Sequence, residues 1–148
     1  MDSKDSDYDI RFVYAHHADW YLNISGPQPD AINVQQSDYD FVGWELRKTL
    51  RLLAKSNPTL YNWVSSEIQY IPTIATQLRE MYHSYLDLNT LYQAYRGLAN
   101  DTWLDHFNGR GRVIIKKYLY VLRPLLAMMY ISQHNAPPPM NFNAHKRS

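Results

Sequence analysis

The stretch DSDYDIRFVY (residues 5–14) joins an acidic run to a segment in which apolar and polar side chains alternate. This alternation of β-branched and aromatic types over Ile10–Tyr14 predicts a half-buried strand. In an extended segment residues i and i+2 point to the same side, so Asp7 and Asp9 would present two carboxylates together. Such a pair repels itself, and a hard divalent cation relieves the repulsion. The alternative is an acidic N-terminal segment that only keeps the chain soluble.

A further carboxylate lies in apolar surroundings. Asp40 stands between two aromatic residues in a second short strand, which we expect at 39–42. A buried charge without a partner is costly, so Asp40 needs a cation or a hydrogen-bond donor. It could complete a three-carboxylate metal site with Asp7 and Asp9. Alternatively, Asp38 or Asp40 could cap the helix that follows.

The rest of the chain has the apolar periodicity of helices. We expect helices at 44–55, 59–66, 72–85, 88–98 and 112–132, with a loop at 26–30 and a turn at 108–111. In the last helix, Leu119, Leu122 and Leu126 are expected to face the core. Pro124 removes a backbone donor there and should kink the helix.

Basic side chains recur at helical spacing in the first of these helices. Lys48, Arg51 and Lys55 would share one face, where they could neutralise the phosphates of a triphosphate or a nucleic acid. The alternative is an ordinary solvated helix face.

The last helix combines basic residues with tyrosines. Lys116, Tyr120 and Arg123 fall on one face, and Lys117 lies next to it. Basic residues interleaved with aromatic ones suit a surface that binds phosphates and bases. The alternative is an amphipathic core helix with basic residues at its border.

Composition excludes several classes of protein. The 148 residues are 45% hydrophobic, which is enough for a core and excludes a wholly disordered chain, and the formal net charge of +1 excludes binding of nucleic acid by net charge alone. The absence of cysteine excludes disulfides and Cys-ligated zinc. The six histidines show no metal-ligand spacing. The acidic N-terminus and a longest apolar run of only 125–131 favour a soluble cytoplasmic protein without a membrane span.

Three blocks of sequence resemble one family. SDYDIRFVY (6–14) looks like the metal-binding strand of the DNA polymerase β-type nucleotidyltransferase superfamily. GWELRKTL (43–50) with KSNP (55–58), and KKYLYVLRPLLA (116–127), are similar to its predicted branch associated with RNA repair. The blocks cover nearly the whole chain and occur in the same order as in the family.

The resemblance implies an α/β fold, with an incomplete nucleotidyltransferase-type mixed sheet followed by a mainly helical C-terminal half. The sheet region with the metal-binding strand would be 1–43, the helical region 44–136 and a Pro-rich, frayed tail 137–148.

The resemblance also implies transfer of a nucleotidyl group from a nucleoside triphosphate to a hydroxyl acceptor such as RNA. Asp7, Asp9 and Asp40 would hold Mg²⁺ or Mn²⁺ and act as the catalytic carboxylates. Contacts to nucleotide or RNA phosphates would come from Lys48, Arg51, Lys116, Lys117, Tyr120 and Arg123.

The chain departs from the family pattern in one respect. The superfamily carries a Gly-Ser turn about ten residues before its paired aspartates, and that turn holds the nucleotide phosphates. Only six residues precede Asp7, and none forms such a pair, so the chain resembles a family member shortened at both ends. The unpaired sheet edge that this implies favours self-association. The alternatives to an enzyme are therefore a non-catalytic RNA- or partner-binding remnant, or a fragment without function.

Overall fold

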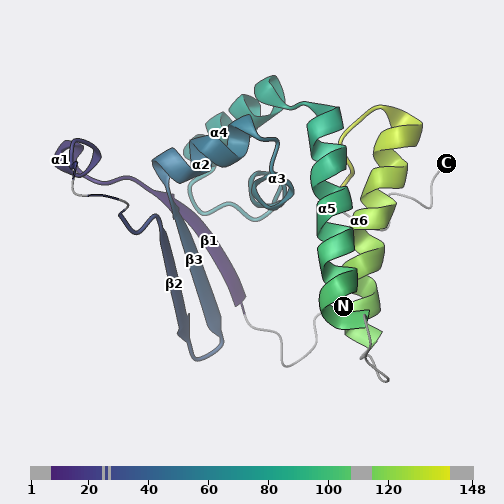
Figure 1. Cartoon of the computed structure of the whole chain (residues 1–148). Coiled ribbons are helices and arrows are strands. Elements are labelled where there is room, and N and C mark those ends of the chain that lie inside the picture. Colours follow the sequence, from purple (N-terminus) through teal and green to yellow (C-terminus); the bar gives the residue numbers. More distant parts are fainter. Residues whose placement is uncertain (1–7, 25, 27, 108–114, 141–148) are drawn as a thin grey trace. The chain divides into compact units, whose positions relative to one another are not determined.

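A computed structural model describes residues 8–24, 26, 28–107 and 115–140. The chain divides into two compact units, 1–52 and 53–148. A small three-stranded mixed sheet is followed by a mainly helical region, which confirms the predicted α/β class (Figure 1).

In the first unit the elements are β1 (Tyr8–Tyr14), α1 (Ala18–Tyr21), β2 (Ala31–Gln36), β3 (Tyr39–Glu45) and the start of α2 (Leu46–Ala54). The strand order is β1-β3-β2, with β3 in the centre, parallel to β1 and antiparallel to β2. Gly43 in β3 permits this packing, because a Cβ there would meet the ring of Phe12 on β1. The central strand β3 therefore pairs with β2, which precedes it directly in the sequence, and with β1, which is further away in the sequence.

The strand β2 was not predicted from the sequence. It forms a hairpin with β3 in which Gln36 pairs with Tyr39, so Ser37 and Asp38 make a two-residue turn. Ser37 adopts a φ of 52°, in the left-handed region that favours glycine. The turn lacks the Asn-Gly or Asp-Gly pair that marks such hairpins in a sequence, and this is why β2 was missed.

The second unit contains the remaining helices of the described residues. These are α3 (Pro58–Val64), α4 (Pro72–Tyr85), α5 (Leu88–Phe107) and α6 (Ile115–His134). The side chain of Asn57 accepts hydrogen bonds from the backbone N–H groups of Thr59 and Leu60 and so begins α3. The helix α4 begins and ends where the sequence predicted, whereas α5 continues nine residues beyond the expected end at Leu98. The turn expected at 108–111 lies outside the described residues.

The helices α5 and α6 pack side by side as a hairpin (Figure 1). Their common core consists of Leu91, Tyr95, Ala127 and Ile131. Burial raises the pKa of Tyr95 strongly, so its hydroxyl stays protonated.

The prediction that three leucines of α6 face the core was wrong. Leu119, Leu122 and Leu126 are all exposed, and the buried residues of α6 are Pro124, Ala127 and Ile131. These residues recur at i, i+3 and i+7, and the small side chain of Ala127 allows α5 to approach closely. The helix α6 continues through Pro124 and extends from Ile115 to His134. In the part of the chain that the structure describes, no helix combines the length and apolarity that a bilayer crossing requires.

Candidate active site

Two predicted carboxylates meet across the sheet. The parallel register of β1 and β3 places Asp9 opposite Asp40, so both side chains project from the same face. Asp9 is exposed, and the side chain of Asp40 is 35% exposed. Asp7 lies outside the described residues, and its expected place beside Asp9 stays a prediction.

Arg11 links the two carboxylates. Its Nη2 donates to Oδ1 of Asp9 at 2.6 Å and to Oδ2 of Asp40 at 2.9 Å. Its Nη1 donates to the backbone oxygen of Asp40 at 2.9 Å. Arg11 was not among the predicted site residues, although its place two residues after Asp9 puts it on the same strand face. The three side chains form the carboxylate–arginine cluster.

The donor set of this cluster fits magnesium in its chemistry. Mg²⁺ prefers oxygen ligands and is usually held by one or two carboxylates, with water and substrate phosphates completing its coordination. Asp9 and Asp40 supply two such carboxylates on neighbouring strands. Among the described residues no three His, Cys, Asp or Glu side chains gather into a metal-binding group. The predicted third carboxylate, Asp7, lies outside those residues, so its part in a metal site stays a prediction.

Glu45, rather than Asp38 or Asp40, begins the helix that follows β3. Its Oε2 accepts a hydrogen bond from the backbone N–H of Lys48 at 3.2 Å. The alternative in which Asp38 or Asp40 caps this helix is therefore wrong: α2 begins at Leu46, and Asp40 is paired within β3. The backbone N–H groups in the first turn of a helix have no partner within the helix, and the side chain of the preceding residue can accept hydrogen bonds from them. In α2 that residue is Glu45.

Glu45 is fully buried and hydrogen-bonded to a tyrosine. The hydroxyl of Tyr21 donates to Oε1 of Glu45 at 2.5 Å and accepts from the backbone N–H of His16 at 3.3 Å. Burial by itself raises the pKa of Glu45, but the hydrogen bonds from Tyr21 and from the N–H groups of Arg47 and Lys48 outweigh it and lower the pKa. The pKa of Tyr21 is raised, mainly by its hydrogen bond to Glu45. The pair is therefore a carboxylate with a neutral phenol.

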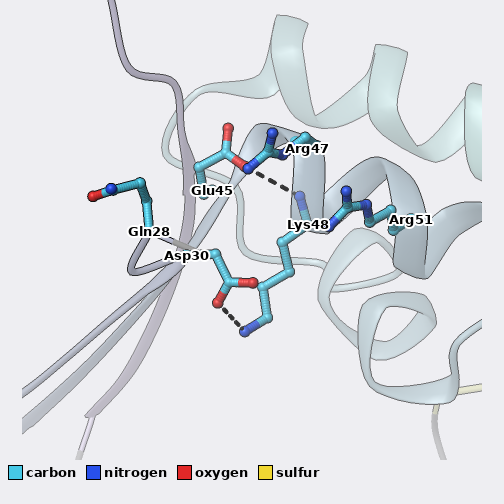
Figure 2. A pocket seen from close by; sticks show the side chains of 6 residues that line it. All are labelled: Gln28, Asp30, Glu45, Arg47, Lys48 and Arg51. Atoms are coloured by element: carbon cyan, nitrogen blue, oxygen red, sulfur yellow. Dashed lines mark hydrogen bonds and ion pairs between the residues drawn. The ribbon is translucent and has the colours of Figure 1, made fainter. Parts of the chain in front are cut away.

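A pocket of about 250 Å³ opens beside Glu45, at the start of α2 (Figure 2). We call it the basic pocket; its lining residues are Gln28, Asp30, Glu45, Arg47, Lys48 and Arg51. The Nζ of Lys48 forms an ion pair with Oδ1 of Asp30 at 2.8 Å, and Figure 2 shows the lysine side chain reaching toward that carboxylate. Arg51 is exposed and has no ion pair among the described residues, so its charge is available to an anion. Lys55, expected on the same face, lies beyond the end of α2 and outside the lining residues.

Two aromatic rings lie near Arg47, one of the residues that line the basic pocket. Its guanidinium lies 4.9 Å from the ring centroid of Trp20 and 6.0 Å from that of Tyr21. Trp20 in turn stacks on His16, with centroids 4.3 Å apart. Asp30, Glu45 and Arg47 were not predicted from the sequence as site residues. Glu45 and Arg47 are neighbours at the start of α2, but Asp30 joins them only when β2 pairs with β3.

The carboxylate–arginine cluster and the basic pocket are separate places on the first unit. Asp40 and Glu45 are five residues apart in β3, which is roughly 16 Å at about 3.3 Å per residue. An odd separation along a strand puts the two side chains on opposite faces of the sheet. The structure thus brings Asp9 and Asp40 together, and it brings Lys48 and Arg51 together, but it does not join the two pairs.

The remaining predicted residues lie on α6 in the second unit. The Nζ atoms of Lys116 and Lys117 lie 6.0 Å and 5.3 Å from the ring centroid of Tyr120. Tyr120 and Arg123 are exposed. The expected grouping of lysines with a tyrosine is thus present on this helix, while the phosphate-binding role of the group stays a prediction.

Comparison with known proteins agrees with the resemblance found in the sequence. The RlaP family model, described as the RNA repair pathway DNA polymerase beta family, matches residues 1–148. The chain is 44% identical over 143 residues to the uncharacterized protein YcgL of Bacillus subtilis (strain 168), an alignment that covers 95% of this chain and 54% of YcgL. It therefore spans about half the length of that relative. No solved structure matches the chain significantly. The match along the whole sequence establishes that the chain belongs to the RNA repair pathway DNA polymerase beta family.

Proposed function

We propose that this protein takes part in metal-dependent transfer of a nucleotidyl group from a nucleoside triphosphate to a hydroxyl of RNA. The observation that carries the proposal is the pairing of Asp9 with Asp40 on one face of neighbouring parallel strands. Membership of a polymerase β-type family supports the reaction class, and its RNA-repair description supports the acceptor. The reaction consumes nucleoside triphosphates, so we place it in the cytoplasm.

The proposed transfer exchanges one phosphoester bond for another. The acceptor oxygen forms a bond to the α-phosphorus, the bond from that phosphorus to the bridging oxygen breaks, pyrophosphate leaves, and the hydroxyl proton passes to water. Bound Mg²⁺ or Mn²⁺ would supply Lewis-acid stabilisation of the charged oxygens. Asp9 and Asp40, with Asp7, would hold the metal, and the sheet would fix their orientation.

The basic pocket suits the acceptor rather than the reacting triphosphate. It lies roughly 16 Å from the carboxylates and on the other face of the sheet, by the strand spacing above. Lys48 and Arg51 would therefore contact RNA phosphates away from the reacting end. Lys116, Lys117, Tyr120 and Arg123 would give a second set of RNA contacts, with Tyr120 offering a ring for stacking.

A non-catalytic RNA-binding module is the second candidate function. The observation that favours it is Arg11, whose guanidinium already satisfies Asp9 and Asp40 without any metal. In that case the basic residues would bind RNA, and the carboxylates would only stabilise the sheet.

The deciding experiment measures transfer and metal binding in the same variants. The chain is incubated with α-labelled triphosphates, an RNA oligonucleotide and Mg²⁺ or Mn²⁺, as the native sequence and as D9N, D40N and D19N. We expect D9N and D40N to reduce transfer by about 10²-fold or more, the scale on which groups that stabilise charge act, and to weaken Mn²⁺ binding. D19N, at an exposed position on α1, is the matched control.

Two outcomes would contradict the proposal. If D9N and D40N leave transfer and Mn²⁺ binding unchanged, the carboxylates are not the metal site. If the native chain binds RNA but transfers no label with either metal, the RNA-binding module is the better account.

A further inference from the structure

We propose that Arg11 is an internal counter-ion that occupies the carboxylate pair in the metal-free protein and is displaced when a divalent cation binds. This inference rests on the proposed function, because it takes Asp9 and Asp40 as the metal ligands. It adds a residue that the metal must compete with before the site can be loaded.

The geometry of the guanidinium supports this role. One nitrogen, Nη2, lies within 2.9 Å of an oxygen from each carboxylate, so the guanidinium occupies the space between the two carboxylates. The second nitrogen, Nη1, is tied to the backbone oxygen of Asp40. Arg11 therefore contacts both carboxylates and the backbone of β3, whereas an isolated surface ion pair has a single contact.

The charges favour replacement of Arg11 by a divalent cation over binding of both cations at once. Asp9 and Asp40 carry two negative charges on directly opposed positions, which destabilises a sheet unless a cation lies between them. Arg11 neutralises one of these charges and leaves a net charge of −1 on the cluster. A divalent cation added beside Arg11 would give three positive charges against two negative ones, with the two cations in mutual repulsion. The lowest-energy response is for the guanidinium to move away.

The exposure of the cluster leaves room for that movement. The side chain of Arg11 is 26% exposed and that of Asp9 is 69% exposed. A hydrated ion can reach Asp9 from solvent, and the flexible arginine stem can carry the guanidinium outward. No rearrangement of the strands is needed, because the contacts that change belong to side chains.

The experiment measures metal affinity in proteins that differ only at Arg11. Mn²⁺ and Mg²⁺ are titrated calorimetrically into the native chain, R11Q, R11K and the control R96Q, whose parent arginine is exposed on α5. We expect R11Q, which loses the charge, to bind Mn²⁺ about tenfold more tightly, within the 5- to 150-fold range common for coupled sites. R11K, which keeps the charge, and R96Q should stay close to the native affinity.

A second measurement uses the unsubstituted protein and does not depend on the folding of R11Q. The side-chain NMR signal of Arg11, assigned by its loss in R11K, should move toward the position of a solvent-exposed arginine as Mg²⁺ saturates the site. A signal that stays unchanged at saturating Mg²⁺, or an R11Q variant that binds Mn²⁺ no better than the native chain, would overturn the proposal.

The double variant D9N/R11Q separates this inference from the proposed function. If D9N weakens Mn²⁺ binding while R11Q leaves it unchanged, the metal site stands and the displacement of Arg11 is wrong. If D9N changes nothing in either background, the proposed metal site itself is wrong.

Discussion

Glu45 carries its negative charge at a position without solvent exposure. Burial opposes that charge, and the Tyr21 hydroxyl together with two backbone N–H groups at the start of α2 more than compensates, so that the pKa is lowered. The charge of Glu45 is thus stabilised mainly by hydrogen bonds, with a smaller contribution from the positive charge of Arg47. Its carboxylate lies among the lining residues of the basic pocket, together with Asp30 and the three basic side chains.

The lowered pKa of Glu45 makes stability depend on pH. A carboxyl with a depressed folded-state pKa stabilises the protein above its unfolded value, near 4.5, and this contribution is lost as pH falls through the folded pKa. We expect E45Q to lower the free energy of unfolding by about 1 kcal/mol at pH 7 and by less at pH 3. Urea unfolding at both pH values measures the difference, with exposed Glu80 as the control in E80Q. A deficit of E45Q that is the same at both pH values would contradict this role.

The hairpin of β2 and β3 brings Asp30 to the basic pocket and has an unfavourable backbone conformation in its turn. Ser37 adopts a left-handed conformation that costs an L-residue about 1–2 kcal/mol, and glycine avoids this cost. We expect S37G to stabilise the protein by about 0.5–1 kcal/mol, because part of the gain is offset by the greater freedom of glycine in the unfolded chain.

The neighbouring position provides the matched control for the hairpin. Asp38 is not among the residues with positive φ, so D38G should destabilise the protein. Chemical unfolding of both variants decides the matter. A less stable S37G would show that the turn does not retain its left-handed residue in solution.

Elements with strong local signals could be predicted from the sequence. Pro72 at the first helical position set the start of α4, and the alternation after Asp9 identified β1. A carboxylate site that includes Asp9 and Asp40 was also expected, because Asp9 leads directly into one expected strand and Asp40 is a charged residue within the apolar segment of another. Their metal-binding and catalytic roles stay predictions.

Features that depend on tertiary pairing could not be predicted. Arg47 and Asp30 meet in the basic pocket only through the β2–β3 register, which no spacing encodes. The buried face of α6 was assigned to leucines on hydrophobicity, whereas Ala127 is buried because close helix packing needs a small residue. Hydrophobic pattern alone could not reveal which of two apolar faces would be covered.

On the scale of the whole molecule, the formal net charge of +1 conceals local clusters of basic side chains. Lys48 belongs to the basic pocket and Lys116 to the α6 group, and each would neutralise one phosphate of a bound RNA. RNA affinity should therefore depend on salt more strongly than the net charge suggests.

Salt titrations of RNA binding test this distribution of charge. We expect K48A and K116A each to reduce the slope of log affinity against log salt by about 0.7, the value for one contact to a single strand. K55A, which removes an exposed lysine just beyond α2, should leave the slope unchanged. If the slopes of K48A and K116A equal that of the native chain, Lys48 and Lys116 are ordinary solvated side chains.

The parallel pairing of β1 with β3 has a consequence for the order of folding. The hairpin of β2 and β3 closes over two residues, whereas Arg11 and Asp40 are separated by 29 positions along the chain. Closing the longer loop costs more entropy, so we expect the hairpin to form early and β1 to dock late. Interactions that form after the transition state slow unfolding and leave the folding rate nearly unchanged. The ion pairs of Arg11 would then slow unfolding of the sheet once β1 has docked. Replacement of these ion pairs by a bound metal ion would change the unfolding rate, and so the lifetime, of the folded first unit.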